Sequence, residues 1–327
     1  MSRHVAAVAA RCCGPIYSTM NRTLSHIPTK PLYRSFNGCR WLQTGFDTRS
    51  SVVCSSNSIR QGEVHLWWMP IDCGSHRDES YTVCREFLEP VDEAETLDKA
   101  LLSGREAEVR GLVARAYLRH VLSSYTGVSK NPREIEFVRN EFGKPEMKNR
   151  DDHGITFNMT HSRGVVGVAV SSGRGIGIDV EAKERRTRKI DEMKLAQRYF
   201  SQYEIDMLAA VAPGEERRLL FVQLWTLKES YVKAIGRGIG ASPGLCSFSF
   251  SLNMDEKNIE FLPSIQEPKY ETPWSFTLLE PFPGYIGAVC SEPCTNMSMF
   301  VSPALTSCRS IDTVGHTTVQ VPVLATT

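Results

Sequence analysis

Two acidic residues in one short segment have the type and spacing that phosphate chemistry uses. Asp179 and Glu181 are two residues apart in the strand-like segment GIGIDVE, so their carboxylates share one face of that strand. Close carboxylates repel each other unless a cation lies between them, and Mg²⁺ favours one or two carboxylates together with substrate phosphates. The alternative is a solvated strand end whose acids pair with Lys183, Arg185 or Arg186.

A second segment, WTLKESYVKAIGRG, adds a third carboxylate and an ammonium group. Trp225, Glu229 and Lys233 are each four residues apart, so on a helix they form one stripe. Beside a metal-binding pair, the acid would accept a proton and the lysine would stabilise a departing phosphate. The alternative is a surface Glu–Lys pair worth about 0.2–0.5 kcal/mol, although a tryptophan in the stripe argues against a purely solvated face.

Two shorter segments offer further contacts for phosphate. FNMTHS places Thr160, His161 and a serine at the end of an apolar strand, and FGKP places Lys144 on a turn. The alternatives are a structural histidine and an exposed turn lysine. Two glycine patterns, starting at Gly173 and Gly236, resemble dinucleotide fingerprints but lack the strand before and the helix after, so we interpret them as turns and a helix stop.

Apolar periodicity predicts the elements that position these residues. A capping box is expected at Ser201 and Glu204, a hairpin loop at 173–175, and weak helical periodicity over the acidic residues 79–102. A helix followed by a strand occurs twice, which is compatible with two similar α+β halves, although this succession is too common to decide between a duplication and unrelated elements. The expected helices are 105–124, 191–200 and 215–235, and the expected strands are 64–72, 134–139, 155–159, 165–171, 176–180 and four more within 245–290.

Composition places the chain in the soluble globular class. Of 327 residues, 41% are hydrophobic and 23% charged, and no stretch approaches the ~18 apolar residues that a membrane span needs. The net charge of +1 gives no chain-wide footprint for nucleic acid, so neither nucleic acid nor a membrane is expected as a partner. The ten cysteines form no Cys-x-x-Cys pair, so we expect reduced thiols and no zinc site.

The charge is concentrated at the N-terminus. Residues 1–60 hold eight Lys or Arg and one acid, Asp47, giving +7, so the other 267 residues carry −6. A basic, Ser-rich and acid-poor segment is typical of an organelle transit peptide, and the prominent arginines favour the mitochondrion over a plastid. The alternative is a disordered basic tail of a cytosolic protein. The expected organisation is a leader over 1–60, α+β halves over 61–172 and 173–290, and a loosely ordered tail over 291–327.

Taken in order, the chemical segments resemble the surfactin-type (group II) 4′-phosphopantetheinyl transferases. The four matching motifs are GKP at 143–145, FNMTHS at 157–162, GIDVE at 177–181 and WTLKESYVK at 225–233. The resemblance implies a monomer of two α+β halves related by pseudo-twofold symmetry, with coenzyme A in the cleft between them. It implies transfer of the phosphopantetheine arm to a serine of an apo acyl carrier protein, with release of 3′,5′-ADP. A mitochondrial address would indicate the fatty-acid carrier of that organelle.

The resemblance also implies a role for each matching residue. Asp179, Glu181 and Glu229 would hold Mg²⁺, Glu229 would also deprotonate the carrier serine, and Lys233 would bind phosphate and assist departure. The expected coenzyme A contacts are Lys144, Thr160, His161 and, with a weaker match, Arg110. The chain between Ser103 and Arg105 is shorter than the family pattern. A coenzyme A-binding relative without turnover is therefore one alternative, and another Mg²⁺-dependent nucleotide hydrolase is a second.

Overall fold

The fold is taken from a computed structural model. It describes residues 51–52, 58–71, 84, 88, 105–126, 131–148, 154–173, 175–184, 191–238, 244–263, 273–302, 316–318 and 323–327. The predicted leader over 1–60 lies outside these residues except at 51–52 and 58–60. The acidic segment 79–102 lies outside them except at Cys84 and Leu88.

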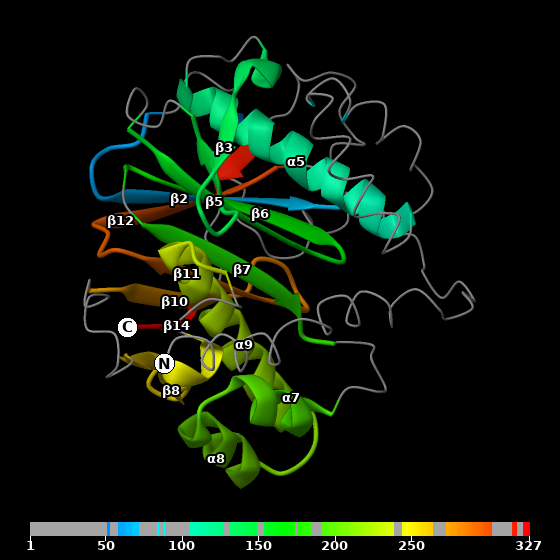
Figure 1. The fold of residues 1–327 in the computed structure, drawn as a ribbon, viewed down its shortest axis with the longest axis vertical. Helices are drawn as coiled ribbons and strands as arrows, with labels where there is room; N and C mark the ends of the chain where they lie inside the picture. The colour runs from blue at the N-terminus through cyan, green and yellow to red at the C-terminus, as the bar shows by residue number, and fades with distance from the viewer. Residues whose placement is uncertain are drawn as a thin grey trace, which may run out of the picture.

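The N-terminal half is a mixed sheet covered by one long helix. The strands follow the order β1-β13-β12-β2-β6-β5. Helix α5 (Arg105–Thr126) runs across this sheet in the upper part of Figure 1. The strands are β1 (Ser51–Val52), β2 (Glu63–Pro70), β5 (Thr156–Ser162), β6 (Val165–Ser171), β12 (Asn296–Val301) and β13 (His316–Thr318).

The C-terminal half repeats the arrangement with a second sheet and a second long helix. Its strand order is β7-β11-β10-β14-β9-β8, and α9 (Glu215–Ile235) lies along it in the lower part of Figure 1. Helices α7 (Glu192–Tyr199) and α8 (Gln202–Ala210) pack beside α9. The strands are β7 (Ile176–Ala182), β8 (Ser249–Asn253), β9 (Asn258–Leu262), β10 (Ser275–Leu279), β11 (Tyr285–Ser291) and β14 (Val323–Thr326).

Three apolar clusters form the core of the described residues. One lies between α5 and the N-terminal sheet, and another lies between α9 and the C-terminal sheet. The third joins the two sheets, because β7 side chains such as Ile178 and Val180 are buried with Leu66 and Trp68 of β2. A small hairpin of β3 (Phe137–Arg139) and β4 (Pro145–Met147), preceded by a 3-10 turn at Pro132–Glu134, projects from the N-terminal half. A second 3-10 turn, Leu245–Ser247, precedes β8.

The predicted hairpin loop at 173–175 is wrong. Strand β6 pairs with β2 and β5 in the N-terminal sheet, whereas β7 pairs with β11 in the other sheet. The chain therefore crosses between sheets here, through Gly173 at φ 74° and Gly175, whose N–H donates to the Glu292 carboxylate over 2.9 Å. Adjacency in the sequence favours a hairpin of β6 and β7, but the two strands belong to different sheets and each pairs with a strand that is distant in the sequence.

The predicted loosely ordered tail is also wrong where the structure describes it. Strand β12 runs parallel to β2 along its whole length, and β14 lies between β10 and β9. Residues beyond 290 thus supply interior strands to both sheets. Sparse charge and many Ser and Thr residues are as compatible with strands as with a tail. The domain boundaries at 172 and 290 stay a prediction.

Two local predictions, the helix at 215–235 and the capping box, are confirmed. Helix α9 spans the expected 215–235 and ends at Gly236, which adopts a left-handed φ of 74°. The capping box at Ser201 is present, because Glu204 accepts from the Ser201 N–H and the Ser201 hydroxyl accepts from the Glu204 N–H. No helix in the described residues is long and apolar enough to cross a membrane.

Glu204 also forms a fully buried ion pair with Lys228 of α9. Their side chains are 2.8 Å apart with no exposed surface. The ammonium also donates to the carbonyls of Leu245 and Phe248, and the other Glu204 oxygen accepts from the Phe250 N–H. Burial lowers the pKa of Lys228 to about 8, against the opposing effect of Glu204. This pair fixes the rotation of α9 against α8 and the turn before β8.

Candidate active site

The site is built on an unusually close approach of α9 to β7. A Cβ added at Gly177 of β7 would lie 2.0 Å from the Ser230 carbonyl oxygen and 2.4 Å from the Ala234 nitrogen. No side chain fits there, so the helix backbone rests directly on the strand. Gly177 lies within β7, as the strand expected at 176–180 predicted, so this residue of the glycine pattern that starts at Gly173 is not part of a turn and its function is close packing.

Close packing brings the Lys233 side chain of α9 onto the β7 backbone. Its ammonium lies 2.6 Å from Oδ1 of Asp179, donates to the Ile178 carbonyl over 3.1 Å and donates to the Thr160 hydroxyl over 3.3 Å. Thr160 in turn donates to the same Asp179 oxygen over 3.1 Å. Three elements, β5, β7 and α9, therefore meet at a buried carboxylate.

Asn158 was missed by the sequence reasoning, although it is the polar residue in an apolar strand. It is 7% exposed, and its Oδ1 accepts from the Ile178 N–H over 3.0 Å. Because β5 and β7 belong to different sheets, this bond links the two sheets one residue before Asp179. An asparagine between buried apolar neighbours is a usable signal, since a buried amide needs a partner.

The three predicted metal ligands differ in their exposure to solvent. Asp179 and Glu229 are each 6% exposed, whereas Glu181 at the end of β7 is half-buried. Oδ2 of Asp179 is buried and makes no hydrogen bond to any described residue, so it offers a hard oxygen to a cation. Among the described residues, no three acidic, histidine or cysteine side chains form one metal-binding group. The donor chemistry fits Mg²⁺, and the ligand set stays a prediction.

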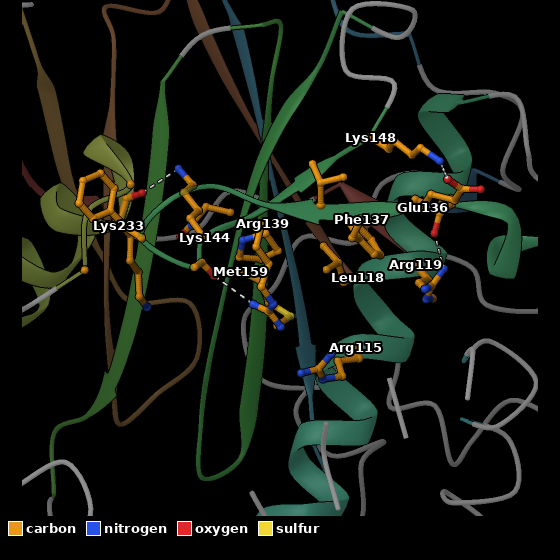
Figure 2. A pocket seen from close by; sticks show the side chains of 18 of the residues that line it. Arg115, Leu118, Arg119, Glu136, Phe137, Arg139, Lys144, Lys148, Met159 and Lys233 are labelled. Carbon is orange, nitrogen blue, oxygen red and sulfur yellow. Dashed lines mark hydrogen bonds and ion pairs between the residues drawn. The ribbon is translucent and has the colours of Figure 1, made fainter. Parts of the chain in front are cut away.

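Lys144 does not point at open solvent as the turn alone suggested. Its ammonium donates to the carbonyls of Lys233 (2.7 Å), Ile176 (3.2 Å) and Ala234 (3.4 Å). It therefore bridges the β3–β4 hairpin to the end of α9, where exposed carbonyls favour a cation. Figure 2 shows Lys144 reaching from the hairpin towards α9 and Lys233.

A cavity of about 1050 Å³ lies between α5, the β3–β4 hairpin and the end of α9. Arg115, Leu118 and Arg119 of α5 lie on one side of it, and Lys144 and Lys233 lie on the other (Figure 2). Its charged lining is mostly basic, which suits an anionic ligand. The basic residues are Arg115, Arg119, Arg133, Arg139, Lys144, Lys148 and Lys233, and the acidic ones are Glu134 and Glu136.

The arginines in this lining were not predicted as site residues. Some of them have structural contacts: Arg119 is 3% exposed, donates to the carbonyls of Pro132 and Ile135, and lies over the Phe137 ring. Arg139 donates to the carbonyl of Gly143 within the hairpin. Arg115 and Arg119 are four residues apart within the largely apolar stretch 111–122 of α5, so this basic i, i+4 pair was the available signal.

The structure describes all of the predicted site residues. Two of them, Lys144 and Lys233, line the cavity. Thr160 lies with Asp179, and His161 is exposed on β5, one residue beyond the buried Thr160. Arg110 is half-buried on α5 and is absent from the cavity lining. The structure thus gathers Thr160, Asp179 and Lys233, and the phosphate roles of His161 and Arg110 stay predictions.

Trp225, at the start of the predicted stripe, belongs to the core and not to the site. Its ring packs near Tyr199, Phe200 and Phe221 at centroid distances of 5.6–6.3 Å. The stripe therefore passes from the core at Trp225, through the buried Glu229, to the cavity at Lys233. The same face of α9 thus packs in the apolar core near Trp225 and meets the cavity near Lys233.

Comparison with known proteins decides the family. Residues 175–290 match the family model of the 4′-phosphopantetheinyl transferase superfamily. The 4′-phosphopantetheinyl transferase HetI of Nostoc sp. is 31% identical over 231 residues, which cover 69% of this chain and 85% of HetI. The chain belongs to the Sfp-type 4′-phosphopantetheinyl transferase family. Two further transferases are similar: Sfp of Bacillus subtilis (34% identical; 57% of this chain, 75% of Sfp) and gsp of Aneurinibacillus migulanus (35%; 58% and 70%).

Family membership confirms the resemblance drawn from the four motifs and the α+β fold class. The superfamily match starts two residues before Gly177 and ends at the last residue but one of β11, so it contains β7, α9 and the Asp179–Lys233 contact. This transferase therefore takes coenzyme A as its substrate. The basic cavity beside Lys233 has the charge that such a polyanionic substrate requires.

Proposed function

We propose that this transferase moves the 4′-phosphopantetheine arm of coenzyme A to a serine hydroxyl of an apo acyl carrier protein and releases 3′,5′-ADP. The single observation that carries the proposal is the Lys233–Asp179 contact at the edge of a basic cavity. It places an ammonium and a buried carboxylate, both suited to pyrophosphate cleavage, beside space for a nucleotide.

The reaction forms one bond and breaks one bond at the same phosphorus atom. The serine oxygen attacks the phosphate of the phosphopantetheine arm, and the bond from that phosphorus to the bridging pyrophosphate oxygen breaks. The bridging oxygen leaves with 3′,5′-ADP, so phosphate and charge balance once the serine proton is removed. Glu229 accepts that proton, and Lys233 stabilises the negative charge that develops on the leaving phosphate.

Asp179, Glu181 and Glu229 would hold Mg²⁺ in this scheme, and the ion would neutralise pyrophosphate charge when bound. Support comes from the buried Oδ2 of Asp179, which has no hydrogen bond to a described residue. We expect a chelator to abolish transfer and added Mg²⁺ to restore it. The proposed contacts to the phosphates and the nucleotide end of coenzyme A are Lys144, Thr160, His161 and Arg110.

The test is transfer to purified apo carrier proteins in the presence of coenzyme A and Mg²⁺, followed as the mass of the carrier. Wild-type protein should add one phosphopantetheine, and Glu229→Gln should lower the rate about 10²–10⁴-fold while retaining the fold. The matched control is Glu216→Gln, the same change at an exposed residue in the first turn of α9, which should keep the wild-type rate.

The other outcomes of this assay distinguish the alternatives. Coenzyme A binding without any mass gain on several carriers would indicate a relative without turnover. Coenzyme A cleavage in the absence of carrier would indicate a nucleotide hydrolase. Wild-type transfer by Glu229→Gln would refute the assigned base.

We also propose that residues 1–60 direct the enzyme to the mitochondrion, where it would act as a monomer on the fatty-acid carrier of that organelle. The support is the +7 charge of this segment. A fluorescent reporter carrying residues 1–60 tests the address, because plastid or cytosolic fluorescence would contradict it. Light scattering of the purified enzyme tests the monomer.

A further inference from the structure

The turn between β3 and β4 contains a side chain that reaches across to the other half of the protein. Oδ1 of Asn140 accepts from the N–H groups of Phe142 (3.0 Å) and Lys144 (2.9 Å), which shapes the turn. Nδ2 of the same amide donates to the carbonyl of Gly236 over 3.0 Å. Asn140 therefore uses one end of its amide to shape the hairpin and the other to hold it against α9.

The contact point on α9 is built for this approach. Gly236 ends the helix with a left-handed φ of 74°, and a Cβ there would lie 3.1 Å from Nδ2 of Asn140 and 3.1 Å from Cδ of Lys144. The next residue, Arg237, places its guanidinium 5.5 Å from the Phe142 ring centroid, which adds a cation–π contact between the same segments.

A chain of hydrogen bonds leads from this turn to the reacting group. Asn140 fixes the backbone of Lys144, and the Lys144 ammonium donates to the carbonyl of Lys233 over 2.7 Å. The Lys233 ammonium then lies 2.6 Å from Asp179. Asn140 itself is absent from the cavity lining, so within the described residues it acts on the cavity through Lys144 and the last turn of α9.

We propose that Asn140 is a positioning residue for phosphopantetheine transfer, an inference that rests on the function proposed above. Its bond to Gly236 holds the last turn of α9 at a fixed distance from the hairpin. The Lys233 backbone belongs to that turn, so the bond sets where the Lys233 ammonium lies relative to the substrate phosphate. Substrate positioning of this kind affects the rate of the chemical step more than ground-state affinity.

Two substitutions separate the two functions of the amide. Asn140→Asp keeps an oxygen for the N–H groups of the turn but removes the donor to Gly236. Asn140→Ser replaces the amide donor by a shorter hydroxyl that does not reach the Gly236 carbonyl, adds no charge and accepts turn bonds only weakly. If the bond to Gly236 positions Lys233, both variants should lower kcat about tenfold, and Asn140→Ser should keep the KM for coenzyme A within about twofold of wild type.

An activity-independent readout accompanies the kinetics. Hydrogen exchange of the peptide covering 232–238 should be faster in both variants, because the last turn of α9 loses its anchor. The matched control is Asn253→Asp, at an exposed residue whose Oδ1 also accepts a turn N–H, that of Glu256. It should change neither kcat nor exchange at 232–238.

Each result either supports or overturns the proposal. A wild-type kcat in Asn140→Asp, with only Asn140→Ser impaired, would show that Asn140 merely shapes the turn. A loss confined to coenzyme A affinity would make Asn140 a binding residue, and unchanged exchange at 232–238 would also overturn the proposal. If wild-type protein transferred nothing to any carrier, the proposed function would fail, and exchange would still decide whether Asn140 anchors α9.

Discussion

Replacing Gly177 by alanine tests the close approach of α9 to β7. The new Cβ would lie 2.0 Å from the Ser230 carbonyl oxygen, 2.4 Å from the Ala234 nitrogen and 2.9 Å from its Cα. All three are backbone atoms, and Ser230 and Ala234 are the i and i+4 partners of one helical turn. No rotamer change can relieve the contact, so the helix itself must move away from the strand.

The required movement can be estimated from these distances. Real Cβ atoms essentially never come within 3.0 Å of another atom, so relieving a 2.0 Å contact needs a shift of about 1 Å. Overpacking of this kind costs about 1–3 kcal/mol of stability. Glu229 and Lys233 lie on the same stretch of α9, and misplacing catalytic groups by about 1 Å can lower a rate about 10²-fold. That fall corresponds to about 2.7 kcal/mol in activation free energy.

The assay combines transfer kinetics with thermal unfolding, and Gly287→Ala is the matched control. Gly287 pairs with Val180 of β7 from the neighbouring strand β11, and its new Cβ would meet Cδ1 of Leu279, the end of a flexible side chain, at 2.8 Å. We expect Gly177→Ala to lose about 10²-fold in kcat and Gly287→Ala to stay within about threefold of wild type. A wild-type kcat and unfolding midpoint in Gly177→Ala would refute the reasoning.

Three further predictions concern stability and reactivity. Lys228→Met should lower the free energy of unfolding in urea by about 3–5 kcal/mol because it leaves the Glu204 carboxylate buried and unpaired, and a loss below about 1 kcal/mol would contradict this. Burial lowers the pKa of His65 below its usual 6.5, so the unfolded chain binds this proton more readily than the folded chain. Stability should therefore fall as the pH decreases from 7 to 5, and His65→Gln should show a shallower fall in its thermal midpoint; equal slopes would argue against it. Burial raises the pKa of the Cys84 thiol to about 12, so iodoacetamide at pH 8 should modify the exposed Cys246 in the native protein and Cys84 only after unfolding, as mass spectrometry of the two peptides would show.

Local structure was predictable where its cause is local. The bounds of α9 follow from apolar spacing and from Gly236, which stops the helix in a left-handed conformation. The capping box at Ser201 follows from two residues three apart. The motif residues Thr160, Asp179 and Lys233 were predicted as a site, and the structure brings them into contact.

The remaining features depend on partners distant in the sequence. A hairpin of β6 and β7 was predicted because they are neighbours in sequence, yet β6 pairs with β2 in one sheet and β7 pairs with β11 in the other. The alternative for Lys144 was an exposed turn lysine, but its ammonium donates to carbonyls 89 and 90 residues away in the sequence. The ion pair of Lys228 with Glu204 was not predicted, because no local pattern in the sequence distinguishes a buried lysine from an exposed one.

The strand order also constrains how the chain can fold during synthesis. Strand β14 is translated after β9 and β10 but lies between them, and β12 is translated after β2, with which it pairs over six residues. The N-terminal sheet cannot be completed before residue 318 is translated, and the C-terminal sheet not before residue 326, so both depend on contacts of high sequence separation. Until then β2, β9 and β10 each have an edge without its final partner strand, and unpaired strand edges are prone to aggregation. Late completion of both sheets would also keep the polypeptide unfolded for longer, which the organelle import proposed above would require.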